Sequence, residues 1–330
     1  MDNLPEHVLV ENILLLLPVK SLVCMRSVCK SWRSLILNPD FVELHMAKTM
    51  ADPYSDNLIA YDRWSDDQLS VVNTNFLDKG VSYLDFPSNP KSCYVVGSCN
   101  GLICVAYEQN IGKPKRLYLW NPATREVVRT VTEAKYASVM PIRVEVYSLI
   151  KNNWKEIKVK TNLLLQSKCP VIVKGAIYWK IKHVVDYHSR FALLSFDVKS
   201  ENLCTISLPD SIMCRQYSWD ISLFEFKESV AVIDEKGQNE DISIWTLDDD
   251  RCWIMKFTIT MRPSPFKIVG CLKTGEIVGK NCVDGRLLLY NPVNNVVKQT
   301  QLKIANPRVY SFSESLVNLS LLKQEYAKEG

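Results

Sequence analysis

An internal repeat constrains the fold of this 330-residue chain more than any other feature. Five segments pair an aromatic residue with a polar turn and a second strand-like run, and the aromatics are Trp120, Tyr147, Phe196, Trp245 and Tyr290. The spacings between them are 27, 49, 49 and 45 residues. Three of the four match the period of roughly 45–50 residues of a four-stranded propeller blade. The repeat therefore predicts an all-β, propeller-like body.

A more apolar hairpin precedes four of the five segments, as a blade with inner and outer strand pairs requires. These predicted inner hairpins cover residues 98–104, 171–179, 223–232 and 268–278. The first turns at Asn100-Gly101, the strongest short-range hairpin signal. No inner hairpin is recognisable between Glu126 and Ile142. Sequence divergence would explain this, but we favour a true deletion because the flanking repeats are intact, so one blade is expected to be incomplete.

The two ends of the predicted body also carry short β runs. Residues 58–61, 69–72 and 81–84 are rich in strand-forming residues. One hypothesis is that residues 58–83 and 309–319 jointly complete a blade that joins both ends of the body. The number of blades stays open at this stage.

The N-terminal residues follow a helical period instead. Leu9, Ile13, Leu16 and Leu17 recur at i, i+4, i+7 and i+8, and Pro18 then ends that helix. The same spacing continues through Leu22, Met25, Cys29, Trp32 and Ile36. Asn38-Pro39 then predicts a break between this run and the next apolar residues, Phe41, Leu44 and His45. Such a small bundle can barely bury its own core, so a covering partner is expected. Residues 46–56 lack this periodicity and are predicted to be a link.

Composition excludes several classes of function. Lys and Arg number 40 against 36 Asp and Glu, and a net charge of +4 does not predict nucleic-acid binding. The acidic Asp2 and Glu6 stand where a signal peptide would be basic, and the apolar run 13–17 is too short to span a membrane. Eleven Cys without a secretory signal indicate reduced thiols. We expect a protein of the cytoplasm, the nucleus or both, with no membrane partner.

No arrangement of residues predicts catalysis, a metal site or a cofactor. His183 and His188 are five residues apart in an expected loop, and no Ser or Cys motif accompanies them. Two cysteine pairs, Cys24/Cys29 and Cys99/Cys104, lack the spacing of zinc ligands and are expected to pack in the core. Residues 248–250 form an acidic turn without the Gly and Glu of a calcium loop. The densest basic stretch is expected to be solvated, with acidic-substrate contact as the alternative; it contains Lys113, Lys115, Arg116, Arg125 and Arg129.

Two sets of motifs resemble a known protein family. The first lies in residues 3–48 and resembles an F-box; its marks are Leu4-Pro5, Leu9, Ile13-Leu14, Leu17-Pro18, Leu22, the run 26–32 (RSVCKSW) and Phe41. The second resembles the F-box-associated interaction domain of the large plant F-box family, which includes the S-locus F-box proteins; its marks include GSCNGL (97–102), LWNPATRE (119–126), VEVYSL (144–149), KGAIYW (174–179) and LYNP (289–292). Family members carry a Gly-Phe-Gly-Tyr-Asp-like segment and a Tyr-Lys-Val strand that are missing between Arg129 and Val144.

The resemblance implies an α+β multidomain chain. It implies a three-helix F-box over residues 1–48, a linker with the first strands over 49–92, a propeller-like (kelch-like) domain over 93–322 and a flexible tail over 323–330. It also implies a substrate-recognition subunit of an SCF-type E3 ubiquitin ligase, a receptor that is not itself an enzyme. The F-box would bind the Skp adaptor, and through it the cullin and the RING protein, while the β domain binds an unknown protein substrate.

The expected adaptor anchors are apolar residues of the F-box: Leu4, Pro5, Leu9, Ile13, Leu17, Pro18, Leu22, Val28 and Trp32. About half of them would instead form the core of the bundle. Two other functions remain open: a non-ligase scaffold or inactive product damaged by the missing hairpin, and a propeller enzyme with an appended helical segment. The chain does not disclose which substrate it would bind.

Overall fold

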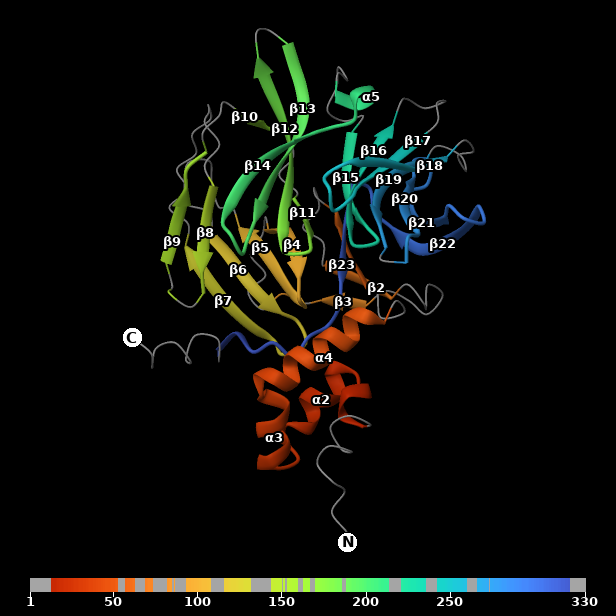
Figure 1. The fold of residues 1–330 in the computed structure, drawn as a ribbon. Coiled ribbons are helices and arrows are strands. Elements are labelled where there is room, and N and C mark those ends of the chain that lie inside the picture. The colour runs from red at the N-terminus through yellow and green to blue at the C-terminus, as the bar shows by residue number, and fades with distance from the viewer. Residues whose placement is uncertain are drawn as a thin grey trace.

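The protein consists of a helical module joined to a larger body of antiparallel sheets, seen in a computed structural model (Figure 1). The structure describes residues 13–52, 57–62, 69–73, 82–84, 86, 93–107, 116–131, 144–149, 151, 153–159, 163–166, 170–185, 188–213, 221–235, 242–259, 266–272 and 274–320. Helices α2, α3 and α4 lie at the bottom of the view, and the sheets are arranged around a common centre above them.

The helical module contains a short 3₁₀ turn and three α-helices in the described part of the chain. They are η1 (Leu14–Leu16), α2 (Val19–Met25), α3 (Lys30–Leu37) and α4 (Pro39–Ala51). The apolar run that was predicted to continue from Leu22 to Ile36 is divided between α2 and α3. The Ser27 hydroxyl donates to the Cys24 carbonyl at 2.6 Å, and the Cys29 sulfur accepts from the Trp32 amide at 3.4 Å. These side chains bond backbone groups at the helix ends, so one helix ends and another begins.

Helix α4 begins at an Asn-Pro signal. The Asn38 side chain accepts from the Asp40 amide at 2.8 Å, and Pro39 occupies the first helical position, where its missing N–H costs nothing. The helix then runs to Ala51, so the prediction that residues 46–56 form a link was wrong for its first six residues. Phe41 and His45 lie one turn apart and are the buried residues of this helix.

The strands form six antiparallel sheets within the described ranges. Sheet A contains, in spatial order, β23 (Pro307–Phe312), β1 (Asn57–Asp62), β2 (Leu69–Asn73) and β3 (Ser82–Leu84). Sheet B contains β4 (Cys93–Cys99), β5 (Leu102–Tyr107), β6 (Arg116–Asn121) and β7 (Glu126–Val131). Sheet C contains β8 (Val144–Ser148) and β9 (Asn153–Ile157).

The other three sheets follow in chain order. Sheet D contains β10 (Leu163–Leu165), β12 (Ala176–Val185), β13 (His188–Asp197) and β14 (Asn202–Ser207), with β11 (Val171–Val173) also paired to β12. After the short helix α5 (Asp210–Met213), sheet E contains β15 (Ile221–Phe226), β16 (Ser229–Glu235), β17 (Ile242–Leu247) and β18 (Trp253–Ile259). Sheet F contains β19 (Phe266–Cys271), β20 (Ile277–Asn281), β21 (Arg286–Asn291) and β22 (Val296–Lys303).

Three of the predicted outer hairpins share one turn chemistry. The polar residue after the repeat aromatic accepts a hydrogen bond from a backbone amide two or three residues later: Asn121 from Ala123 at 2.9 Å, Asp197 from Ser200 at 2.6 Å and Asn291 from Val293 at 2.9 Å. The turn then ends in a left-handed residue, with φ of 59° at Arg125, 54° at Glu201 and 59° at Asn295. Asx turns of this kind fix a hairpin locally, which is why the repeat could be read from sequence.

Sheet A closes the body by pairing its two ends. Strand β1 runs antiparallel to β23 from Asn57 opposite Phe312 to Asp62 opposite Pro307. The carboxylate of Asp62 also accepts from the backbone amides of Ala305 and Asn306 at 3.1 and 3.2 Å. The hypothesis that the two ends of the body share one sheet is confirmed.

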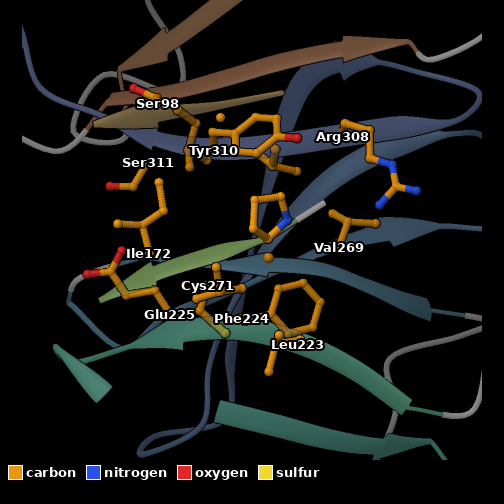
Figure 2. A pocket seen from close by; sticks show the side chains of 16 residues that line it. Ser98, Ile172, Leu223, Phe224, Glu225, Val269, Cys271, Arg308, Tyr310 and Ser311 are labelled. Atoms are coloured by element: carbon orange, nitrogen blue, oxygen red, sulfur yellow. The ribbon is translucent and has the colours of Figure 1, made fainter. Parts of the chain in front are cut away.

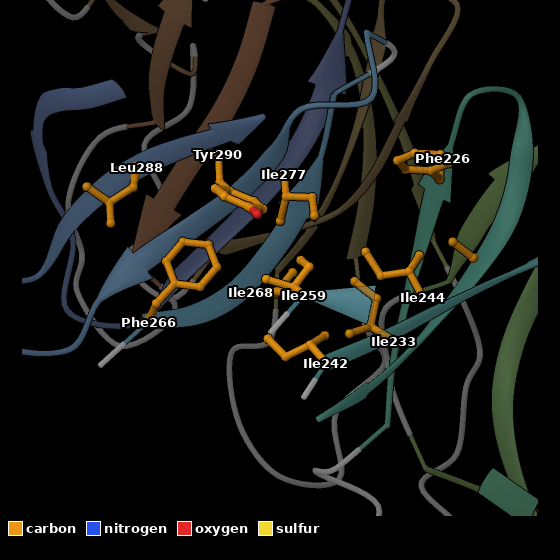
Figure 3. Packing of buried hydrophobic residues seen from close by; sticks show 11 residues of the cluster. Phe226, Ile233, Ile242, Ile244, Ile259, Phe266, Ile268, Ile277, Leu288 and Tyr290 are labelled. Atoms are coloured by element: carbon orange, nitrogen blue, oxygen red, sulfur yellow. The ribbon is translucent and has the colours of Figure 1, made fainter. Parts of the chain in front are cut away.

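The core lies between neighbouring sheets. Figure 3 shows the cluster between sheets E and F, where Ile233, Ile242 and Ile244 face Phe266, Ile277 and Tyr290. Comparable buried clusters join sheets D and E, F and A, and A and B. Each sheet of this arc is therefore held by apolar contacts with its neighbours, the packing expected of a propeller-like fold.

Sheet C is the predicted incomplete blade. It has two strands in the described part of the chain. The Ser148 hydroxyl accepts from the Lys151 amide at 3.1 Å, so Ser148 plays the part in this turn that Asn121 and Asp197 play in the outer turns of sheets B and D. The hairpin is therefore an outer one without an inner pair among the described residues. At the centre, a Cβ on Gly97 of β4 would lie 4.0 Å from Cδ1 of Ile172 on β11. The inner strands of sheets B and D are thus neighbours at the centre of the body.

Candidate protein-docking sites

The helical module buries an apolar core of its own. Leu14, Val19, Leu22, Ile36 and Phe41 are buried together and are joined by Leu316 from the C-terminal end of the body. The imidazole of His45 is buried beside them, with Nε2 2.9 Å from the Leu17 carbonyl oxygen. The module is therefore packed internally, and its remaining apolar side chains are available on the surface.

Four large apolar side chains stay exposed in the described part of this module. The exposed fractions are 41% for Ile13, 63% for Leu16, 66% for Val28 and 50% for Leu44. Pro18 is exposed as well. Scattered single apolar residues are ordinary on a protein surface, but four on a module of three short helices are suited to bind an apolar partner surface.

The predicted anchors divide between this surface and the core. Ile13, Pro18 and Val28 are exposed, while Leu17 and Trp32 are half-buried against the core cluster. Leu22 is fully buried, so its assignment as an anchor is corrected: it holds α2 on the bundle and cannot touch a partner without unfolding. The other three, Leu4, Pro5 and Leu9, lie outside the described residues.

Leu16 and Leu44 were not among the predicted anchors. Leu16 was placed on the same helical face as Ile13 and Leu17, but the chain there forms a 3₁₀ turn, with three residues per turn rather than 3.6. The tighter turn directs Leu14 and Leu15 into the core and leaves Leu16 outside. Leu44 lies on α4 three residues after the buried Phe41, where the helical period favours the buried face, so hydrophobic spacing gave no signal of its exposure.

The body has a cavity of about 130 Å³ at its centre. It is lined by the innermost strands β4, β11, β15, β19 and β23 (Figure 2). Each of these strands has one hydrogen-bonded neighbour in the described part of the chain, so its other edge faces the cavity. Backbone N–H and C=O groups on such edges are able to bind water or a polar ligand.

The side chains around this cavity are mixed in character. Apolar Ile172, Val269 and Phe224 alternate with polar Ser98 and Ser311, and Glu225 and Arg308 lie on opposite sides of the view in Figure 2. Burial raises the pKa of the Cys271 thiol to about 12, so this thiol stays protonated at neutral pH. The lining is suited to bind a ligand.

The residues considered for catalysis and metal binding remain dispersed. The described part of the chain holds no group of three or more His, Cys, Asp or Glu that could bind a metal ion. His183 and His188 lie in paired strands β12 and β13 rather than in a loop, because the hairpin extends to Val185 opposite His188. The acidic turn at 248–250 is closed by a local hydrogen bond, in which the Asp248 carboxylate accepts from the Cys252 amide at 2.6 Å.

The other motifs singled out from the sequence also have structural positions. Cys24, Cys29 and Cys99 are exposed rather than packed in the core, and Cys29 caps α3. Arg125 and Arg129 are exposed as expected, whereas the Arg116 guanidinium lies over the Tyr107 ring, 6.0 Å from its centre. Lys113 and Lys115 lie outside the described residues. No described helix has the length and apolar character needed to cross a membrane.

The protein thus has two parts, an internally packed helical module with exposed apolar side chains and a ring of sheets. Comparison with known families names both parts. A family model described as the F-box associated beta propeller domain matches residues 130–321, and the F-box domain model matches residues 1–44. The chain belongs to the F-box-associated β-propeller family and carries an F-box, as the sequence motifs predicted.

The curated relatives are F-box proteins of Arabidopsis thaliana. F-box/kelch-repeat protein At3g23880 is 25% identical over 297 residues, covering 77% of this chain and 76% of the relative. F-box protein At5g10340 is 23% identical over 320 residues, covering 79% and 70%. Two other Arabidopsis F-box proteins, at 26% and 25% identity, are matched over only 64% and 62% of their own lengths.

Solved structures share the fold only at a low level. Virginiamycin B lyase of Staphylococcus aureus has 9% sequence identity and a TM-score of 0.40, covering 79% of this chain and 97% of that one. The periplasmic gluconolactonase of Pseudomonas aeruginosa has 10% identity and the same TM-score, covering 78% and 99%. Similarity at this level supports no inference about activity.

Proposed function

We propose that this protein is the substrate-recognition subunit of an SCF-type E3 ubiquitin ligase and has no catalytic activity of its own. The observation that carries the proposal is the exposed apolar set Ile13, Leu16, Val28 and Leu44 on an F-box whose core is already filled. In this proposal the F-box binds the Skp adaptor, and through it the cullin and the RING protein. The propeller holds the protein that is to be ubiquitinated.

The energetics of docking fit an apolar helical surface. Fully burying a side chain such as Leu or Ile contributes about 1.5–3 kcal/mol, so four anchors contribute roughly 6–12 kcal/mol. Association costs of about 4–15 kcal/mol consume much of that amount. Tight binding therefore needs further contacts, and the predicted anchors Leu4, Pro5 and Leu9 are the candidates next to Ile13 in the chain.

The experiment replaces exposed anchors with a charge. Leu16→Asp and Val28→Asp place a carboxylate where the apolar adaptor surface would sit, and we expect each to weaken adaptor binding at least about tenfold, or 1.4 kcal/mol. Calorimetry with purified Skp adaptor measures the affinity, and thermal melting shows whether the fold is intact.

A matched control introduces the same charge far from the F-box. Val293, in the β21–β22 turn, is 78% exposed, so Val293→Asp should leave adaptor affinity unchanged. If the two F-box variants bind the adaptor like the control, the proposed docking face is wrong.

The propeller side of the proposal concerns an unidentified substrate. The closed ring, with its central cavity and loop ends, supports an intact recognition domain over a product damaged by the missing hairpin. Proximity labelling in the native tissue, with a proteasome inhibitor present, would collect the candidates. Reconstituted ubiquitination then tests each one; a complete ligase that modifies none of them would favour a non-ligase scaffold.

We also propose that the protein works in the cytoplasm or the nucleus. The free cysteines among the described residues, five of them exposed, suit a reducing compartment. A fluorescent fusion expressed from the native promoter tests this, and secretion of the fusion would contradict it.

A further inference from the structure

The described chain ends in an extended segment, Ser313–Leu319, that we call the C-terminal strap. It leaves β23 and passes between the F-box helices and sheet B, as Figure 1 shows in blue above α3 and α4. The strap lacks regular strand pairing over residues 313–318, yet Leu316 and Leu319 are almost completely buried, at 1% and 0% exposure. An irregular segment this well buried must be held by specific contacts.

One side of the strap contacts the F-box. Leu316 is part of the F-box core cluster, together with Leu14, Leu22 and Ile36. The Arg26 guanidinium, at the end of α2, donates to the Leu316 carbonyl at 3.3 Å. Lys20 also pairs with Glu314 at 3.4 Å, although Lys20 is well exposed and this ion pair adds little.

The other side of the strap is bonded to sheet B. The buried side-chain amide of Asn121 donates to the carbonyls of Ser315 at 3.1 Å and Val317 at 2.8 Å. The Glu126 carboxylate accepts from the Leu319 amide at 2.8 Å. Ala123 lies in the turn between Asn121 and Glu126 and also packs against the F-box core.

Arg26 of the F-box and Glu126 of sheet B also interact electrostatically. Burial lowers the pKa of the Arg26 guanidinium, and the negative charge of Glu126 opposes that shift. The charge of Glu126 thus favours the charged form of Arg26 across the joint, while its oxygen holds the strap. F-box, strap and sheet B therefore meet in one network rather than in two separate contacts.

We infer that the C-terminal strap is a joint that fixes the F-box in one orientation on the propeller, through Leu316 on one side and Asn121 and Glu126 on the other. The two parts then move as one body. Resting on the proposed function, this rigidity would hold a bound substrate at a constant position relative to the adaptor. The joint itself is a claim about this chain alone and is tested without any partner.

The test compares two buried leucines in the full-length protein. Leu316→Ala removes the strap's anchor from the F-box core, whereas Leu302→Ala makes the same change at 8% exposure between sheets F and A. Hydrogen exchange followed by mass spectrometry reports on α3 and α4. We expect exchange there to rise at least about tenfold in Leu316→Ala, or 1.4 kcal/mol, and to stay unchanged in Leu302→Ala.

Orientation is measured separately by small-angle X-ray scattering. Arg26→Ala removes the hydrogen bond to Leu316 without touching the apolar core, so it keeps the test open if Leu316→Ala fails to fold. We expect the distance distribution to broaden in both joint variants and to match the wild type in Leu302→Ala. Wild-type scattering from both joint variants would overturn the inference. Loss of adaptor binding in Leu16→Asp with unchanged scattering bears on the docking face and not on the joint.

Discussion

Gly101 illustrates how a single position serves both a turn and a contact between distant segments. It follows Asn100 in the β4–β5 turn, and both residues have positive φ, 52° and 74°, the geometry of a type I′ hairpin turn. A Cβ at Gly101 would also overlap Ser315 of the C-terminal strap, lying 2.7 Å from its backbone nitrogen. Glycine is therefore required here for its backbone conformation and for its small size.

These two requirements can be separated by comparing two glycines. Gly175 has nearly the same φ, 76°, but a Cβ there meets nothing within 4 Å. Gly175→Ala should cost only the left-handed strain, about 1–2 kcal/mol. Gly101→Ala should cost about 1–3 kcal/mol more, because the strap must shift. Urea unfolding of both variants measures the difference, and equal losses would show that the strap yields freely.

Two thiols inside the body should differ in reactivity from those on the surface. Burial raises the pKa of Cys104 to about 11 and that of Cys271 to about 12, against an ordinary value of 9.0. At pH 8 an alkylating reagent should therefore modify the exposed cysteines first, because the thiolate is the reactive form; these are Cys24, Cys29, Cys99, Cys252 and Cys282. Peptide mass spectrometry after timed labelling checks the order.

The same shifts set a pH dependence of stability. The unfolded chain releases these thiol protons near pH 9, while the folded chain keeps them until about pH 11 to 12. Their contribution to folding is thus fully present below pH 9 and is lost as pH rises through that interval.

In the labelling experiment, early modification of Cys104 or Cys271 at pH 8 would show that these thiols are more accessible than the structure places them.

At the scale of elements, the sequence predicted hairpins well and helix limits less well. The outer turns depend on an Asn, Asp or Ser side chain bonding its own backbone a few residues on, as at Asn121 and Ser148, and such local chemistry is visible in sequence. The 3₁₀ turn at Leu14 and the length of α4 depend on packing within the bundle. Burial of Leu22 and exposure of Leu16 followed from those details, which hydrophobic spacing does not contain.

Two tryptophans of the outer hairpins should have unequal effects on stability. Trp120 is buried at 2% exposure between sheets A and B, and its Ala variant should lose about 3–5 kcal/mol. Trp154 of sheet C is half-buried, and its described ring contact is with Tyr147, 5.0 Å between ring centres, so Trp154→Ala should lose about 1 kcal/mol. Denaturant unfolding measures both, and adaptor binding should survive in each. A large loss at Trp154 would mean that sheet C is better anchored than its half-buried strands indicate.

For the whole molecule, the ring is closed by strands from the two ends of the body, and this could be proposed but not established from sequence. Hydrophobic runs at residues 58–61 and 309–312 are compatible with pairing, but only the observed register, Ile59 opposite Tyr310, shows that β1 and β23 share a sheet. The proximity of β4 to β11 at the centre was not predicted at all. It depends on how far the neighbouring sheets can approach, which no local pattern encodes.

Closure makes folding of the body depend on its last strand. A chain ending at Ile304 lacks β23, exposes the edge of β1 and removes one wall of the central cavity. We expect it to lose cooperative unfolding and near-ultraviolet circular dichroism. A chain ending at Ser320 keeps every described contact and should unfold like the wild type. Cooperative unfolding of the shorter chain would show that the sheets are stable without the closing strand.

The unequal distribution of contacts around the ring has a consequence for how such proteins diversify. The buried cluster, the hydrogen bond and the ion pair that join the F-box to the body all reach the strap or the β6–β7 turn, on one side of the ring. Loop lengths and side chains on the far arc are therefore free to vary without disturbing the attachment. One fixed attachment would then carry many different recognition surfaces.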